Sequence, residues 1–160
     1  MSGKSLTATA AELGEVRADD GTRIGYRRTG RGPAVVLVHG AMMTSQLFEG
    51  LAAALAADFT VYSPDRRGRG LSGPTGPGYG IGTEIADLAV LLRETGAHNV
   101  FGLSSGALIS LNAALELPEI RKLALYEPPL AVPRTARCRS GGHGTNVRSR
   151  RGGWVRRSSV

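Results

Sequence analysis

Short apolar runs alternate with segments of helical spacing along most of this chain. The run AVVLVHG, at residues 34–40, is continuous and rich in Val, which is typical of a strand buried on both faces of a parallel sheet. The segments FTVYS, NVFGL and KLALY predict three further strands, at residues 59–63, 99–103 and 122–126. Four strands of this kind indicate a sheet inside the molecule.

Three helices are predicted around these strands, because apolar residues recur there every three or four positions. Their markers are Phe48, Leu51, Ala52 and Leu55 for the first, Ile85, Leu88, Ala89 and Leu92 for the second, and Leu108, Leu111 and Leu115 for the third. Gly96 is placed to end the second helix, and the third ends before Pro118.

A hairpin precedes this alternation. Asp20-Gly21 is a tight-turn signal between two short predicted strands, residues 13–17 and 24–28. A hairpin followed by strands that alternate with helices predicts an α/β protein, with a mostly parallel sheet and flanking helices.

Composition divides the 160 residues into three parts. Residues 1–11 form a loose N-terminus, residues 12–130 carry the α/β pattern, and residues 131–160 are rich in Arg, Gly and Ser without apolar periodicity. Such a tail buries too little apolar surface to offset its ordering entropy, so we expect it to be disordered. Limited digestion with trypsin is then expected to remove the tail before it cuts the body.

The basic charge of the chain lies in this tail. Residues 1–130 contain 12 Lys and Arg against 13 Asp and Glu, whereas residues 131–160 contain eight Arg and no acidic residue. Such a tail can displace counterions from phosphates, so a non-catalytic protein that binds nucleic acid or an anionic surface is one alternative. Trp154 is its only aromatic residue, so it lacks a stacking platform and we expect no specific nucleic-acid partner.

Cysteine usage and hydropathy predict a cytoplasmic location. Cys138 is the only cysteine, which excludes an internal disulfide and fits a reducing compartment. The first residues lack the apolar segment of a signal peptide, and no stretch approaches the ~20 apolar residues of a membrane span. His, Cys, Asp and Glu are not clustered, so the sequence implies no metal and no organic cofactor.

The pattern Gly-x-Ser-x-Gly occurs at residues 102–106, GLSSG, where a predicted strand meets a predicted helix. Small residues on both sides allow Ser104 to adopt a strained turn that projects its hydroxyl from the carboxyl end of the sheet. The N-terminus of the helix that begins at Ser105 favours a developing negative charge. We interpret Ser104 as a catalytic nucleophile; a plain structural turn is the alternative.

A second strand end adds hydrogen-bond donors. The buried strand at residues 34–40 ends in His-Gly and leads into the loop of VLVHGAMM. The N–H groups of Ala41 and Ser105 are then placed to form an oxyanion hole, a pair of donors to the charged oxygen of an acyl-transfer intermediate. The alternative is that Gly40 merely allows the strand to turn.

The segment GRGLSG, at residues 68–73, matches a dinucleotide-binding pattern. That site requires a helix to begin there, but Pro74 and Pro77 follow, so we reject a dinucleotide cofactor.

The segments VVLVHG, PDRRGRGLSG and GLSSGA, in this order and spacing, resemble the α/β-hydrolase fold family over residues 16–129. The resemblance implies that Ser104 is the nucleophile and that the N–H groups of Ala41 and Ser105 bind the oxyanion. It implies hydrolysis of an ester-like bond in a small molecule. It also implies that Asp65 braces its loop rather than reacts.

A histidine base for Ser104 is not evident. His98 precedes the strand that Ser104 follows, so the two lie about 17 Å apart at ~3.3 Å per residue. His39 occupies a structural position of the family, and His143 lies in the tail. Glu127 occupies a position that some members use for the catalytic acid; a surface or loop-bracing role is the alternative.

The resemblance implies that the family's acid follows a seventh strand and its histidine an eighth, and neither strand is predicted here. We therefore expect this chain to be truncated and inactive, or nearly so. The change near residue 131 is what a reading-frame shift in a GC-rich gene would produce; a genuine basic tail is the alternative. KLALY would then be an exposed sheet edge, open to self-association.

Overall fold

The computed structural model describes residues 11–130, 146–148 and 154–156. The chain divides into two units, one up to residue 130 and one from residue 131, and each is described by itself.

The first unit contains every strand and helix that the sequence predicts. They are β1 (Glu12–Arg17), β2 (Arg23–Gly30), β3 (Ala34–Val38), the 3-10 helix η1 (Ser45–Phe48), α1 (Glu49–Leu55), β4 (Thr60–Pro64), α2 (Ile81–Thr95), β5 (Asn99–Leu103), α3 (Ser105–Glu116) and β6 (Lys122–Tyr126). Gly96 ends α2 in the left-handed conformation, with φ of 64°. The predicted boundaries are therefore confirmed to within a few residues.

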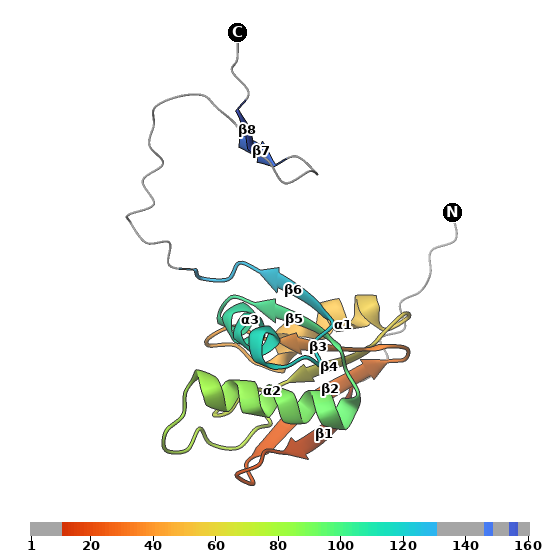
Figure 1. The fold of residues 1–160 in the computed structure, drawn as a ribbon. Helices are drawn as coiled ribbons and strands as arrows, with labels where there is room; N and C mark the ends of the chain where they lie inside the picture. The colour runs from red at the N-terminus through yellow and green to blue at the C-terminus, as the bar shows by residue number, and fades with distance from the viewer. Residues whose placement is uncertain (1–10, 131–145, 149–153, 157–160) are drawn as a thin grey trace, which may run out of the picture. The chain divides into compact units, whose positions relative to one another are not determined.

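The six strands form one mixed sheet in the order β1-β2-β4-β3-β5-β6 (Figure 1). β1, β2 and β4 pair antiparallel, whereas β4, β3, β5 and β6 run parallel. The predicted α/β class with a mostly parallel sheet is confirmed. Because β3, β5 and β6 are parallel neighbours, their carboxyl ends meet at one edge of the sheet.

Two apolar layers cover the sheet, one on each face, and alternate residues of β3 point into them. Val36 and Val38 pack with residues of α2, such as Leu88, in the larger layer. Leu37 packs with Phe48 and with Ala52 of α1 in the smaller one. Helices α2 and α3 therefore lie on one face and α1 on the other (Figure 1).

Helix α3 packs through small residues rather than through the leucines that predicted it. Ala107, Ser110 and Ala113 are fully buried, whereas Leu115 is 79% exposed. The helix lies so close to β5 that a Cβ on Gly102 would come within 2.6 Å of the Cα of Ala107. Only small side chains fit between backbones at that distance.

The second unit is described at two three-residue strands, β7 (Asn146–Arg148) and β8 (Trp154–Arg156), which pair antiparallel. The sequence predicts no strand in this segment, so these six residues differ from the expectation. The rest of the predicted disordered tail lies outside the described residues, and that part stays a prediction.

Candidate active site

Ser104 lies where β5 ends and α3 begins, at the N-cap position of α3. Its backbone has φ of 53° and ψ of −121°, a conformation that L-residues rarely adopt. Its N–H donates a hydrogen bond to the carbonyl of Tyr126 at 2.9 Å, and its carbonyl accepts one from the N–H of Ala107 at 2.9 Å. The predicted sharp strand-to-helix turn is therefore present, and its side chain is partly exposed.

Two glycines make this turn possible. A Cβ on Gly106 would lie 2.5 Å from the carbonyl oxygen of His39 and still closer to that of Val38. A Cβ on Gly102 would lie 2.8 Å from the Oγ of Ser110. Both glycines of the pattern are thus required by close approach of backbone segments.

Strained backbone is concentrated at one edge of the sheet. Among the described residues, the non-glycine residues with positive φ are Met42 (58°), Ser104 (53°) and Glu127 (48°). They follow the carboxyl ends of β3, β5 and β6, three neighbouring strands. Such conformations cost of order 1 kcal/mol or more each and cluster at functional sites.

The loop after β3 approaches Ser104 closely. A Cβ on Gly40 would lie 3.2 Å from the Cβ of Ser104 and 3.3 Å from the carbonyl oxygen of Leu103. Among the described residues, no acceptor is found for the N–H of Ala41 or of Ser105. Ser105 opens α3, so its N–H has no partner within the helix. Both N–H groups thus have no hydrogen-bond acceptor within the described residues.

His39 is fully buried, and both of its ring nitrogens are engaged. Nε2 accepts the backbone N–H of Arg66 at 3.1 Å, so the ring proton lies on Nδ1, which donates to the carbonyl of Gly40 at 2.9 Å. Burial lowers the pKa of His39 from its usual 6.5. The hydrogen bond to the Gly40 carbonyl opposes this effect less strongly, and the charge of Arg66 lowers the pKa further. His39 therefore joins two loops as a neutral imidazole.

Acid is expected to destabilise the fold through His39. Its folded pKa lies below that of the unfolded chain, so the stability it contributes is complete above about pH 6.5 and is lost as the pH falls through the folded pKa. The free energy of unfolding should fall by up to about 1.4 kcal/mol per pH unit in that window. Urea titrations of the chain and of His39→Gln between pH 7.5 and 5.5 measure it. If the free energy of unfolding fell equally steeply with pH in the two proteins, this role of His39 would be contradicted.

A partly buried ion pair connects the two segments that carry the N–H groups of Ala41 and Ser105. Nη1 of Arg66 lies 3.1 Å from the Oγ of Ser105 and 3.4 Å from the carbonyl oxygen of His39. Its other nitrogens bind the carboxylate of Glu84, at 2.5 to 3.1 Å, and the hydroxyl of Tyr79 donates to the same carboxylate. Burial would lower the pKa of Arg66, but the hydrogen bonds and charge of Glu84 outweigh it and raise that pKa.

The cluster of Arg66, Glu84 and Tyr79 is not predictable from the sequence pattern. The Arg-Arg pair after β4 was a visible signal, but its partner on α2 lies 18 residues away and only the fold brings them together. The next residue, Arg67, is also buried and binds Asp87 of α2 and Asp20 of the hairpin turn. These contacts fix the loop after β4 against the helix.

Asp65 braces this loop, as the resemblance implies. Its carboxylate accepts the N–H of Ser45 at 2.5 Å and the N–H of Leu71 at 2.8 Å. Its own N–H donates to the carbonyl of Gly25 at 2.8 Å, and its carbonyl accepts the hydroxyl of Ser72. With every polar group occupied, Asp65 is a structural residue.

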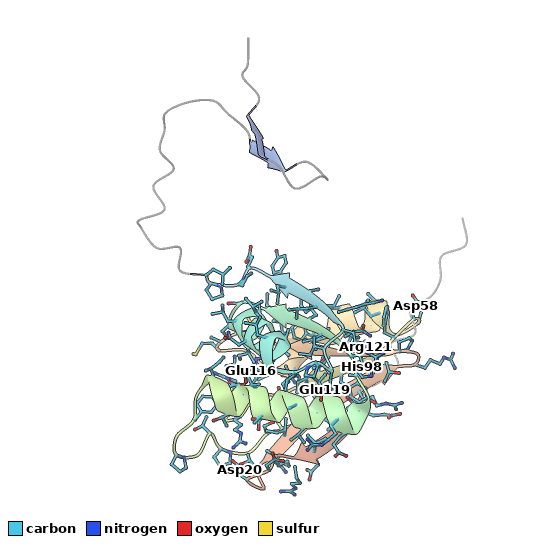
Figure 2. All side chains as sticks on the ribbon, viewed as in Figure 1. Asp20, Asp58, His98, Glu116, Glu119 and Arg121 are labelled. Atoms are coloured by element: carbon cyan, nitrogen blue, oxygen red, sulfur yellow. The ribbon has the colours of Figure 1, made fainter. Side chains whose placement is uncertain are left out.

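The other acid and base candidates do not reach Ser104 by any contact within residues 11–130. Figure 2 shows His98 beside Glu119 and Arg121, at the amino end of the sheet. Its Nδ1 lies 2.8 Å from the carbonyl oxygen of Glu119. Glu127 is exposed, directly after the residue that accepts the N–H of Ser104. His143 lies outside the described residues.

Membrane-spanning helices and metal-binding clusters were sought in the described part of the chain. It contains no helix long and apolar enough to cross a membrane. It also contains no group of three His, Cys, Asp or Glu side chains placed to hold a metal ion.

Comparison with known proteins identifies the family. The model of the alpha/beta hydrolase family matches residues 35–159, and the chain belongs to this family. It is 36% identical over 115 residues to the uncharacterized hydrolase YraK of Bacillus subtilis, covering 69% of this chain and 42% of that protein. It is 34% identical over 126 residues to N-formylmaleamate deformylase of Pseudomonas putida, covering 75% and 46%.

A solved structure matches over the same region. The crystal structure of an alpha/beta hydrolase from Sphaerobacter thermophilus has a TM-score of 0.71 and 48% sequence identity, covering 76% of this chain and 48% of that one. The chain thus spans less than half the length of these relatives.

Proposed function

We propose that residues 12–130 carry the nucleophile and oxyanion hole of a serine hydrolase that acts on an ester-like bond of a small molecule. Ser104 attacks the carbonyl carbon, and the N–H groups of Ala41 and Ser105 bind the negatively charged oxygen that forms. The observation that carries this proposal is the strained turn at Ser104, at φ of 53°, in contact with the loop of Gly40.

The surroundings of Ser104 support this role. A plain structural turn would not need φ of 53° at a serine, because a glycine adopts that conformation without strain. Helix α3 is 12 residues long and points its N-terminus at this position, which favours an oxyanion there. The deformylase among the relatives acts on N-formylmaleamate, a small molecule, which agrees with the class of substrate proposed. The single cysteine supports a cytoplasmic location.

The 160-residue chain itself is proposed to be nearly inactive. A serine hydroxyl is a weak nucleophile until a base accepts its proton. Within residues 11–130, both nitrogens of His39 are engaged and His98 lies at the other end of β5. The matched segment covers less than half of each relative, so residues outside it can supply a base that is not found near Ser104 within residues 11–130 of this chain.

Replacing Ser104 with cysteine tests the proposal without the missing base. A thiolate needs no general base, and a helix N-terminus lowers the pKa of a cysteine. In Ser104→Cys, with Cys138→Ala, the thiolate should attack p-nitrophenyl acetate, form an acetyl thioester and release one equivalent of p-nitrophenolate in a burst.

The matched control is Leu115→Cys in the same Cys138→Ala background. Leu115 is 79% exposed on the last turn of α3, at the end whose dipole disfavours a thiolate. We expect Ser104→Cys to be acylated at least about tenfold faster, by stopped-flow absorbance and mass spectrometry. Equal rates, or faster acylation of the control, would contradict an activating site at Ser104.

A further inference from the structure

Arg66 contacts both segments that carry the proposed oxyanion donors. Its Nη1 lies 3.1 Å from the Oγ of Ser105 and 3.4 Å from the carbonyl oxygen of His39. Its backbone N–H donates to Nε2 of His39 at 3.1 Å. This one residue, in the loop after β4, is therefore hydrogen-bonded both to the segment that follows β3 and to the first residue of α3.

The guanidinium of Arg66 is held in a fixed orientation. The carboxylate of Glu84 binds the edge that Nε and Nη2 form, at 2.5 to 3.1 Å, so Nη1 points away from that carboxylate. The hydroxyl of Tyr79 donates to the same carboxylate, and the side chains of Arg66 and Glu84 are only 11% and 6% exposed. A planar guanidinium held along one edge loses little further freedom when Nη1 binds another group.

The hydrogen bonds of His39 set the direction of the Ala41 N–H. Nδ1 of His39 donates to the carbonyl of Gly40 at 2.9 Å, and that carbonyl belongs to the same planar peptide group as the N–H of Ala41. The C=O and N–H of a trans peptide point in opposite directions, so fixing one of them fixes the other. Because Arg66 binds His39 at its ring and at its carbonyl, a change at Arg66 reaches the Ala41 N–H.

The N–H of Ser105 is restrained in a similar way. It shares a peptide group with the carbonyl of Ser104, which accepts the N–H of Ala107 at 2.9 Å. The bond from Nη1 of Arg66 to the Oγ of Ser105 adds a second restraint, from outside α3. One side chain thus connects the two peptide groups that carry the proposed donors.

We propose that Arg66 is a positioning residue, which holds the N–H groups of Ala41 and Ser105 at the separation that an oxyanion requires. This inference rests on the function proposed above for these two N–H groups. Misplacing a catalytic group by about 1 Å can lower a rate by about 10²-fold, so a clamp between the two segments has a measurable effect.

Arg67 provides the contrast with Arg66. It is also buried and paired with a carboxylate of α2, that of Asp87. Among the described residues, its side chain otherwise binds only Asp20 and Thr22 of the hairpin turn, and neither residue belongs to a donor segment. A purely structural ion pair of this loop therefore exists next to the one that contacts the candidate site.

Two reactions of the chain with Ser104→Cys and Cys138→Ala separate the oxyanion hole from the thiolate. p-Nitrophenyl acetate reacts by attack of the thiolate on its carbonyl carbon, which passes through an oxyanion before p-nitrophenolate leaves. Iodoacetamide reacts by displacement of iodide from a CH₂ carbon and forms no oxyanion. Both reactions need the thiolate, so the ratio of the acylation rate to the alkylation rate cancels any change in the pKa of the thiol. Leu115→Cys gives the reference ratio.

The test removes the clamp in two ways within this background. Arg66→Gln with Glu84→Gln removes both charges together, so no buried charge is left without a partner. We expect the ratio of acylation to alkylation to fall at least about tenfold. Ser105→Ala removes only the Oγ that Nη1 binds and leaves the ion pair in place, and it should lower the ratio in the same direction.

The matched control is Arg67→Gln with Asp87→Asn, which neutralises the neighbouring ion pair and should leave the ratio unchanged. Urea unfolding of each variant separates loss of stability from loss of the ratio, and Ser105→Ala decides the question if the Arg66 variant does not fold. A ratio that survives Ser105→Ala, or that falls equally in the Arg67 control, would overturn the role of Arg66.

The same measurements distinguish this inference from the proposed function. If the Ser104→Cys chain has no higher ratio than Leu115→Cys, there is no oxyanion hole at Ser104 and both proposals fail. If its ratio is high and the variants at Arg66 and Ser105 keep it, the oxyanion hole is supported and only the positioning role of Arg66 is rejected.

Discussion

Gly106→Ala is expected to lower the free energy of unfolding by about 3 kcal/mol or more. The added Cβ would lie 2.5 Å from the carbonyl oxygen of His39 and closer still to that of Val38. Both oxygens belong to the backbone at the end of a buried strand, so neither moves away cheaply. The turn at Ser104 would have to open to accommodate the methyl group.

Gly82→Ala is the matched control for this prediction. Gly82 also lies in a helix, α2, but a Cβ there would meet no heavy atom within 4 Å. Alanine favours helix over glycine, so the control should gain up to about 1 kcal/mol. Urea unfolding of both variants gives the comparison. Similar stability changes in the two variants would show that α3 does not pack against β3 as closely as described.

The fold was largely predictable because the sequence patterns that indicate its strands, helices and turns are local. The valines of β3 and the Asp20-Gly21 turn identify their elements from neighbouring residues alone. The face on which α3 packs was not predictable, since Leu115 is exposed while Ala113 is fully buried. Which face of α3 is buried depends on the distance between α3 and β5, and the sequence of α3 alone does not indicate that distance.

The candidate site was predictable only in part, for the same reason. The small residues around Ser104 indicate a sharp turn, and the structure contains one. The positive φ of Met42 and Glu127 had no sequence signal, because neither is a glycine. The bond from Arg66 to Ser105 spans 39 residues, so it emerges only when the sheet brings the two loops together.

A second prediction concerns the rate of ester hydrolysis. The 160-residue chain should hydrolyse p-nitrophenyl esters only at a trace rate, and Ser104→Ala should leave that rate nearly unchanged. Where a complete triad is present, loss of a member leaves about 10³–10⁴-fold acceleration over water from the oxyanion hole and binding. Joining residues 1–130 to the part of the Sphaerobacter thermophilus hydrolase that follows its matched segment should restore a base, and activity should rise by orders of magnitude.

The most direct test of Ser104 as the nucleophile is the kcat/KM of this chimera for a p-nitrophenyl ester, with and without Ser104→Ala. Ser110→Ala on the same helix is the control, because Ser110 is fully buried and its hydroxyl has no hydrogen-bond partner among the described residues. We predict that Ser104→Ala abolishes the gained activity, while Ser110→Ala keeps it. A folded, active chimera whose kcat/KM survives Ser104→Ala would contradict the account.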